Sequence, residues 1–288
     1  MDVITKIEKN YEHMSKGHKA IANFVLEHFD RAALMNVSRL AETTGVSEAT
    51  VVRFSTELGY EKYQHFQRAI WEYAKTKLNN VQRMNIGFAR MENEGILSSV
   101  LNSDIDKIRS TLSQTDENEF NRAVSAIAKA RRIYIIGLGS ASALASFLGY
   151  YLNLIFDDVR VVSSVGVSEI IDQMYHVTNE DVVIGISFPR YSNRTVNALK
   201  YAKSMGGTVV GVTDGPMSPI TQTSDFCLLA RSDMESFVDS LVAPFSLMNA
   251  LIVALGAIKK DEVYKNLENL ESIWKEYKKY DQANKEEM

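Results

Sequence analysis

The chain has a single cysteine, Cys227, and only four prolines among its 288 residues. One cysteine cannot form an intramolecular disulfide, so the sequence suits a reducing, cytoplasmic compartment. An excess of one charge is also lacking. The net charge of −4 at pH 7 gives no overall electrostatic reason to expect a nucleic-acid partner. Apolar and charged residues occur in ordinary globular proportions, and the length predicts two domains.

A secretory leader is not expected, because the first residues lack the basic-then-apolar order of a signal peptide. Two uncharged stretches, 133–156 and 240–258, are long enough to raise the question of a membrane span. Glycines interrupt the stretch 133–156, and its pattern predicts a strand, a turn and a helix. The second contains Pro244 and polar residues, and predicts a helix buried inside the protein or at a subunit interface. We therefore expect no membrane partner.

The first 80 residues have helical periodicity, and the most informative segment is 37–54. It predicts two short helices joined by a turn at Gly45, since glycine readily adopts the positive φ that such a turn requires. Asn36 and Ser47 directly precede the two helices, and their side chains can accept hydrogen bonds from first-turn N–H groups.

The second helix of this pair has two distinct sides. Val51, Phe54 and Leu58 recur at helical spacing and predict a buried stripe. A helix-turn-helix presents the opposite, exposed side to the DNA major groove. An ordinary αα-hairpin is the alternative interpretation. The side chains predicted to face DNA are Ser47, Glu48, Thr50 and Arg53.

Five short β-rich runs follow Arg132, and helical segments separate most of them. Strands that alternate with helices form a parallel sheet covered on both faces. We therefore predict an α/β chain, in which an all-α N-terminal domain precedes a doubly wound, five-stranded parallel sheet. The expected strands are 133–136, 159–162, 182–186, 208–212 and 225–229.

Composition divides the chain into three parts. The stretch 79–94 is polar and reads as a linker. We predict a helix-turn-helix domain at 1–80, a linker with connecting helices at 81–130, and an α/β domain with C-terminal helices at 131–288.

Two predicted strand-to-helix loops have features of an anion-binding site. In the run 136–142, two glycines permit a tight turn before a helix whose first N–H groups would face an anion. The run 185–195 contains an arginine, which offers a fork of donors for phosphate. Both loops follow parallel strands, at the edge where open α/β sheets bind ligands. The candidate ligand-binding residues are Ser140, Ser142, Ser187, Arg190 and Ser192, although Ser192 is equally placed to cap a helix.

These motifs together resemble the RpiR/MurR family of bacterial transcriptional regulators over nearly the whole chain. The segments 36–41, 45–54 and 58–66 are similar to the family's helix-turn-helix. The segments 137–139, 186–192, 211–214 and 218–220 are similar to the SIS (sugar isomerase) phosphosugar-binding domain.

The resemblance implies a non-enzymatic regulator of carbohydrate-metabolism genes. Its affinity for operator DNA would be controlled by a sugar phosphate bound to the SIS domain. It would act as a homodimer or homotetramer and would need no cofactor or metal. Two loop positions depart from the family pattern. Ala141 stands at the usual serine of the first loop, and Pro189 and Arg190 replace a Ser-Gly pair in the second, where Ser192 stands for a threonine.

Two other functions remain possible from the sequence. The first is a sugar-phosphate isomerase of the same fold, which would need a base near the carbonyl carbon of its substrate. Candidate bases are Glu169, His176 and Glu235. The second is a structural dimerisation module without a ligand, because a fold alone does not determine function.

Overall fold

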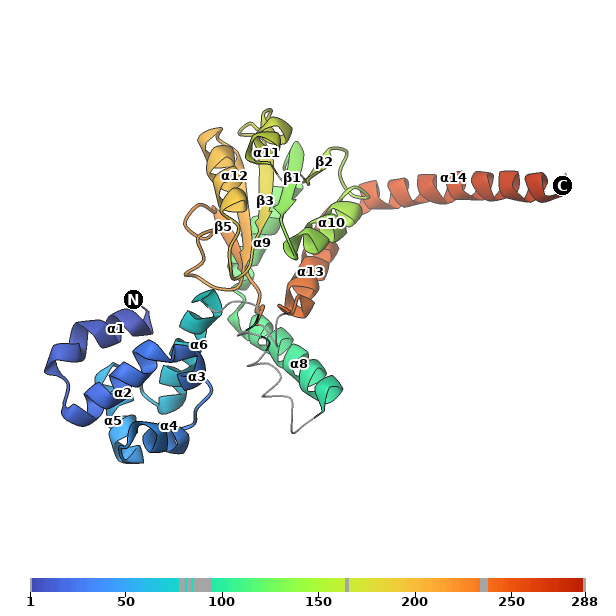
Figure 1. The fold of residues 1–288 in the computed structure, drawn as a ribbon. Coiled ribbons are helices and arrows are strands. Elements are labelled where there is room, and N and C mark those ends of the chain that lie inside the picture. Colours follow the sequence, from blue (N-terminus) through green and yellow to red (C-terminus); the bar gives the residue numbers. More distant parts are fainter. Residues whose placement is uncertain are drawn as a thin grey trace. The chain divides into compact units, whose positions relative to one another are not determined.

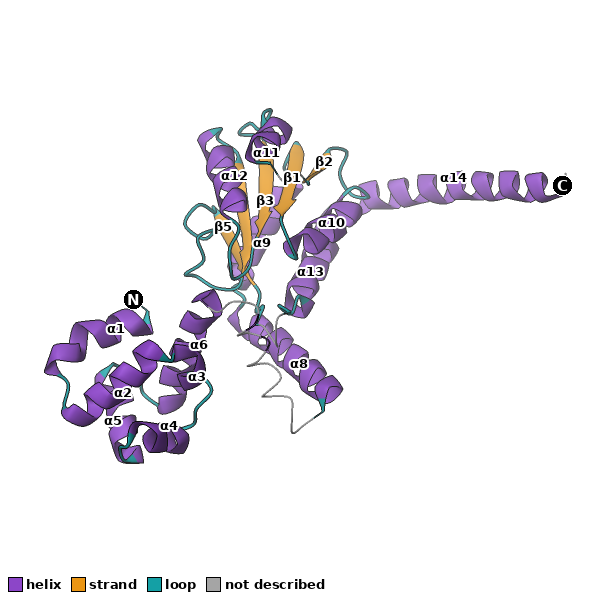
Figure 2. Cartoon of the chain, viewed as in Figure 1, coloured by secondary structure: helices purple, strands orange, loops and turns teal. Residues whose placement is uncertain are grey.

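The computed structural model describes residues 2–77, 81, 84, 95–163, 166–233 and 238–286. The chain divides into two compact units, Met1–Asn93 and Glu94–Met288. The described part of the first unit is helical, and the second combines helices with a sheet (Figure 2). Most of the predicted linker, 79–94, lies outside the described residues.

The first unit is built from short helices around one apolar core. Ile21, Phe54 and Phe66 are fully buried in it, and the rings of Phe54 and Phe66 meet edge to face with their centroids 5.5 Å apart. The predicted helical character of the first 77 residues is confirmed. The elements are α1 (Val3–Asn10), η1 (Tyr11–His13), α2 (Lys16–Glu27), α3 (Phe29–Ala32), α4 (Val37–Thr44), α5 (Glu48–Glu57) and α6 (Tyr63–Lys77).

A buried tyrosine attaches α6 to the segment that leads into α4. The Tyr63 hydroxyl donates a hydrogen bond of 2.6 Å to the Met35 carbonyl oxygen, and the Gln67 side-chain amide donates to the same oxygen at 3.0 Å. Burial raises the pKa of Tyr63 from 10.0 to about 12. The folded state therefore favours the un-ionised phenol, which is the form that can donate this bond.

We expect Tyr63→Phe to lower the free energy of unfolding by about 1 kcal/mol, the usual net contribution of one hydrogen bond. Since the pKa is raised on folding, this contribution is complete below pH 10 and is lost as the pH rises from 10 to about 12. Urea unfolding followed by circular dichroism should show the difference at pH 7 and its decline above pH 10. Tyr60→Phe is the control, because phenylalanine keeps the ring contacts of Tyr60 with Lys6 and Phe66. Equal stability of the two variants would contradict the prediction.

The second unit contains the predicted sheet. All five expected strands are present, all neighbouring pairs are parallel, and the order is β2-β1-β3-β4-β5. The elements are α8 (Ile96–Gln114), α9 (Glu117–Ala128), β1 (Arg132–Gly137), α10 (Ala141–Leu152), β2 (Val159–Val162), α11 (Val167–Met174), β3 (Asp181–Ile186), α12 (Asn193–Ser204), β4 (Thr208–Thr213), β5 (Phe226–Leu229), α13 (Val242–Ile258) and α14 (Lys260–Glu286).

Alternate residues of the central strands pack against different helices, as the pleat requires. Ile133 and Ile135 lie in a core with α9, α10 and α13, whereas Tyr134 and Ile136 lie in a second core with α11 and α12. Helices therefore cover both faces of the sheet (Figure 1). The predicted doubly wound parallel sheet is confirmed.

The apolar segment 240–258 contributes mainly to the core. In α13, Leu247, Met248, Leu251 and Leu255 are buried against the sheet. Among the described residues, no single helix is long and apolar enough to cross a membrane. Helix α13 and the following part of α14 meet that criterion only as a pair, which is bent by 98°.

Candidate DNA-binding and anion-binding sites

The turn between α4 and α5 has the geometry that its sequence predicts. Gly45 has a φ of +68° and ends α4 in the left-handed conformation. The Asn36 side chain accepts a 2.9 Å hydrogen bond from the Arg39 N–H, and Ser47 accepts one of 3.2 Å from the Thr50 N–H. Both predicted N-caps are confirmed. They fix where the two helices begin and hence how α5 leaves the turn.

Helix α5 has the two predicted sides. Val51 and Phe54 are buried, whereas Ser47, Glu48 and Arg53 are exposed. The Nε atom of Arg53 donates to the Ala49 carbonyl oxygen at 3.4 Å. The Arg53 guanidinium thus lies along α5 towards its N-terminus, on the side where a helix-turn-helix contacts DNA.

Thr50 and Glu48 also have structural partners. The Thr50 hydroxyl lies 2.8 Å from the Ser47 hydroxyl, and its methyl group faces Gly17 of α2, where an added Cβ would lie 3.3 Å away. The Ser38 hydroxyl donates to the Glu48 carboxylate, which joins the first turns of α4 and α5. Thr50 and Glu48 therefore help to hold the helix-turn-helix together as well as bordering its exposed side.

The contact at Gly17 brings an exposed lysine to this surface. Lys16 precedes Gly17 in the first turn of α2, and Gly17 borders both Thr50 and Val46. A helix N-terminus with a lysine is a common phosphate-backbone contact in DNA complexes. No sequence pattern indicated this position, because about thirty residues separate Lys16 from the turn.

The strand order brings the two predicted anion-binding loops together. Strands β1 and β3 are direct neighbours, and Gly137 at the end of β1 pairs with Ile186 at the end of β3. From β1 the chain continues to β2 on one side, and from β3 it continues to β4 on the other. The β1/β3 junction is therefore the topological switch point, where open α/β sheets bind ligands.

The loop after β1 turns back tightly onto its own helix. A Cβ at Gly137 would lie 2.5 Å from the Ala141 carbonyl oxygen, and Gly139 has a φ of +64°. Ser140 is exposed at the N-cap position of α10. The Ser142 hydroxyl donates a 2.7 Å hydrogen bond to the Gly139 carbonyl oxygen. In this geometry Ser140 is better placed than Ser142 to donate a hydrogen bond to an anion, because the Ser142 hydroxyl already donates to the Gly139 carbonyl oxygen.

The serines of the loop after β3 act as hydrogen-bond acceptors towards the backbone. The buried Ser187 hydroxyl accepts from the Ser192 N–H at 3.1 Å, and the Ser192 hydroxyl accepts from the Thr195 N–H at 3.3 Å. Ser192 is thus the N-cap of α12, the structural role foreseen for it. Since both hydroxyls accept in these bonds, each retains an O–H that can donate to a phosphate oxygen.

Arg190 has an unusual backbone conformation. Its φ is +68°, the left-handed region that favours glycine. Arg190 stands where the SIS pattern has glycine, so the loop keeps the glycine conformation although the residue has changed. Its guanidinium lies 3.8 Å from the carboxylate of Asp239, whose side chain is only 8% exposed. Strained backbone of this kind is concentrated at ligand sites.

A third loop, after β4, completes this edge of the sheet. The Tyr191 hydroxyl donates a 2.9 Å hydrogen bond to the Asp214 carboxylate, and Thr213 donates to the Ser218 hydroxyl at 2.7 Å. Asp214 and Tyr191 were not among the candidate ligand residues. A carboxylate at this position can accept hydrogen bonds from the hydroxyl groups of a sugar.

The candidate catalytic bases do not come together in the described residues. Glu169 lies in the first turn of α11, at the same sheet edge as the loops above. His176 is exposed beyond the other end of α11, next to Tyr175. Glu235 lies outside the described residues. Glu169 and His176 lie at opposite ends of α11, so they do not form a pair that could act together as the base of an isomerase.

We expect Gly137→Ala to destabilise the protein more than Gly139→Ala. The first change forces a Cβ against a backbone carbonyl oxygen, and overpacking of this kind costs about 1–3 kcal/mol or more. The second meets no atom within 4 Å and loses only about 1–2 kcal/mol through its positive φ. Thermal unfolding of the two variants measures the difference. A larger loss of stability for Gly139→Ala would contradict the prediction. It would mean that the positive φ at position 139 constrains this turn more than the close contact of Gly137 with α10.

The two units define a class of protein. A helix-turn-helix domain is joined to a parallel α/β domain, whose switch-point loops resemble those that bind anions in other proteins. Comparison with known proteins identifies the family. Residues 1–77 match the helix-turn-helix domain of the rpiR family, and residues 126–254 match the SIS domain. The chain belongs to the RpiR family of helix-turn-helix transcriptional regulators that carry a SIS domain.

Relatives from bacteria support this assignment. An uncharacterised HTH-type transcriptional regulator of Haemophilus influenzae is 27% identical over 79% of each chain. The regulator HexR of Escherichia coli is 24% identical over 74% of this chain and 72% of its own. The matched proteins are named as transcriptional regulators.

Solved structures agree with the fold. The sugar isomerase domain of an RpiR transcription factor from Sphaerobacter thermophilus matches with a TM-score of 0.58 and 26% identity, over 62% of this chain and 98% of that one. The NanR protein of Vibrio vulnificus, solved in complex with ManNAc-6P, matches with a TM-score of 0.58 and 21% identity, over 94% and 99% of the two chains.

Proposed function

We propose that this regulator controls carbohydrate-metabolism genes in the cytoplasm, and that a sugar phosphate bound at the β1/β3 edge of its SIS domain changes its affinity for operator DNA. The observation that carries the proposal is the meeting of two loops rich in hydroxyl and N–H donors at the switch point, in a chain with an RpiR helix-turn-helix. NanR, which shares the fold, binds ManNAc-6P. The protein acts as a binding module without catalysis.

The DNA contacts come from the exposed side of α5. Ser47, Glu48, Thr50 and Arg53 face the major groove, and Lys16 contacts the phosphate backbone from the neighbouring helix α2. Because a helix-turn-helix protein normally pairs to match two half-sites, the functional unit is a homodimer or homotetramer that reads a near-palindromic operator.

We expect Arg53→Ala to weaken specific DNA binding by roughly 1–3 kcal/mol, the value of one bidentate contact between an arginine and a base. The DNA is selected from a random-sequence pool by the wild-type protein, and affinity is measured by gel-shift titration at one salt concentration. Arg68→Ala, which removes an exposed arginine of α6, should bind like wild type. If Arg53→Ala also binds like wild type, Arg53 does not read the operator.

The ligand contacts come from the three loops of the sheet edge. Ser140, Ser187 and Ser192 donate hydrogen bonds to the phosphate, and the N-termini of α10 and α12 stabilise its charge. Ser142 joins them only if its hydroxyl leaves the Gly139 carbonyl oxygen. Asp214 accepts from the sugar hydroxyls. Arg190 supplies the positive charge.

Arg190 also gives the ligand a route to the DNA-binding half. Its partner Asp239 is adjacent to Ser240, and the Ser240 hydroxyl donates a 2.6 Å hydrogen bond to Asp104 of α8. A phosphate that binds Arg190 competes with Asp239 for it. Helix α8 is the first described helix after the predicted linker, so a shift of Asp239 and Ser240 reaches the segment that joins the two units. Coupling of this kind is typically worth about 1–3 kcal/mol.

We expect the double variant Ser187→Ala with Arg190→Gly to lose the ligand response and to keep ligand-free DNA binding. Glycine is chosen at position 190 because it keeps the positive φ. Thermal shift with N-acetylmannosamine 6-phosphate, glucose 6-phosphate and other sugar phosphates identifies a ligand, with inorganic phosphate as the control. At 100 times its Kd a ligand stabilises the wild type by about 2.7 kcal/mol. If the double variant keeps that stabilisation, the ligand binds elsewhere.

The isomerase alternative has its own test. Purified protein is incubated with each stabilising sugar phosphate, and aldose–ketose conversion is measured. We expect no turnover. Turnover that disappears in Glu169→Gln would contradict the proposal and favour an enzyme.

A further inference from the structure

Helix α8 packs its polar side against its own domain. Lys107 is only 4% exposed, donates a 2.7 Å hydrogen bond to the Ser103 hydroxyl and lies 3.7 Å from the Asp104 carboxylate. The Thr111 hydroxyl, also buried, accepts a 2.9 Å hydrogen bond from the Arg231 N–H. The inward side of this helix is therefore satisfied by charges and hydroxyl groups.

The outward side of α8 is apolar. Leu97, Leu101, Ile105, Ile108 and Leu112 follow one another at intervals of three or four residues, and all five are exposed. The two ends of this stripe, Leu97 and Leu112, are 73% and 79% exposed and lie about 22 Å apart along the helix. Surface helices normally show the opposite arrangement, and an exposed apolar patch of this size marks an interaction surface.

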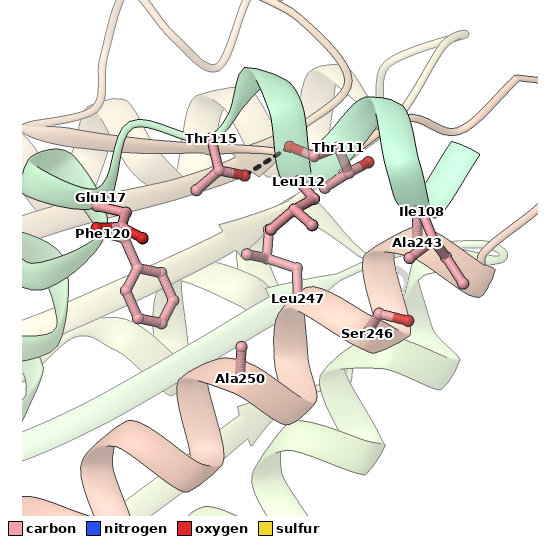
Figure 3. Close-up of a pocket in the computed structure, with 10 residues that line it drawn as sticks. All are labelled: Ile108, Thr111, Leu112, Thr115, Glu117, Phe120, Ala243, Ser246, Leu247 and Ala250. Carbon is pink, nitrogen blue, oxygen red and sulfur yellow. Dashed lines mark hydrogen bonds between the residues drawn. The ribbon is translucent and has the colours of Figure 1, made fainter. Parts of the chain in front are cut away.

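A pocket of about 490 Å³ opens beside the C-terminal half of the stripe, between α8, α9 and α13 (Figure 3). Its hydroxyl groups already have partners. Thr115 donates to the Thr111 carbonyl oxygen at 2.8 Å, and Ser246 donates to the Val242 carbonyl oxygen at 3.0 Å. Small-molecule sites need a few polar groups that converge on the ligand. Apart from Glu117, this pocket presents Ile108, Leu112 and other side chains that are apolar or already hydrogen-bonded, and suits the apolar side chains of a partner.

Helix α13 extends the same surface. Its residues Val242, Ser246, Ala250 and Val253 recur at helical spacing on the side that borders the pocket, and Val242 and Val253 are exposed. We call the two stripes and the pocket between them the α8–α13 face. A standard interface buries about 800 Å² per partner, more than a single helix of this length offers, so the α13 stripe is a necessary part of it.

We propose that the α8–α13 face is the surface through which two copies of this chain pair, with their α8 helices antiparallel across a two-fold axis near Ile105. The face is complementary to itself. Its N-terminal half carries projecting leucines, Leu97 and Leu101, and its C-terminal half borders the pocket. A two-fold axis near the middle of the stripe places the leucines of each copy over the pocket of the other. The inference rests on the proposal that the regulator reads DNA as a pair of copies.

Cysteine cross-linking in the full-length protein tests this axis. A disulfide requires Cα atoms about 4.4–6.8 Å apart, and only residues near the axis meet their own copies at that distance. Ile105→Cys should form a covalent dimer under mild oxidation. Leu97→Cys alone should not, because it lies about 12 Å along the helix from the axis. When the Leu97→Cys and Leu112→Cys proteins are mixed, a disulfide should join position 97 of one copy to position 112 of the other. The wild type, with the half-buried Cys227, is the background control.

Light scattering on the full-length protein tests the surface itself. The wild type should be a dimer, and Leu101→Glu with Ile105→Glu should be a monomer at micromolar concentration, since pairing would bury two carboxylates per copy. Tyr175→Glu, an equally exposed change next to α11 on the other side of the sheet, should remain a dimer. Unchanged circular dichroism confirms that the variants fold.

Two outcomes would overturn the inference. If the double variant stays a dimer and Ile105→Cys does not cross-link, copies pair through another surface, while the proposed function stands. If the wild type is a monomer, the α8–α13 face binds a different protein or a small apolar ligand, and the expected pairing on DNA also fails.

Discussion

The parallel pairing of β1 with β3 is the constraint on which the rest of the SIS domain depends. Because β1 leads to β2 on one side and β3 leads to β4 on the other, α10 and α12 cover opposite faces of the sheet yet begin at the same edge. Their N-termini, each with a partial positive charge, converge there. The anion-binding site proposed at this edge thus depends on topology more than on any one side chain. The replacement of a family glycine by Arg190 leaves this arrangement in place, because Arg190 keeps the positive φ of a glycine.

The features that the sequence predicted well are those decided within a few residues. The left-handed turn at Gly45 and the caps at Asn36 and Ser47 depend on local backbone chemistry, and the five strands follow from short β-rich runs. Contacts between distant segments carried no such signal. The packing of Gly17 against Thr50 could not be foreseen. Neither could the hydrogen bond from Tyr191 to Asp214 nor the pairing of Arg190 with Asp239, since each joins loops that only the folded sheet brings together.

Helix α8 shows a further limit of sequence patterns. Its helical period is visible in the sequence, but periodicity does not say whether an apolar side is buried inside one chain or between two. In this protein the polar side faces inward, because Thr111 meets the Arg231 N–H and Asp104 meets the Ser240 hydroxyl. Arg231 and Ser240 supply polar groups that an apolar side of α8 could not satisfy. The five aliphatic side chains are left exposed, which is why we assign them to a contact with a second copy.

The same helix therefore stands between the ligand edge and the proposed contact with a second copy. Asp239 faces Arg190, and its neighbour Ser240 holds Asp104 of α8. The Arg190 guanidinium is 47% exposed and lies 3.8 Å from the Asp239 carboxylate, so a ligand at the sheet edge can reach it from solvent. In the proposed mechanism a phosphate, which offers more charge and bidentate geometry than one carboxylate at 3.8 Å, displaces Asp239 from Arg190. In this proposal Asp239, which is nearly buried, loses its contact with Arg190, and its adjustment acts on the polar side of α8 through Ser240. In the proposed dimer the opposite side of α8 faces the second copy, so a ligand at the sheet edge would change how the two copies pair and thereby the spacing of their DNA-binding helices.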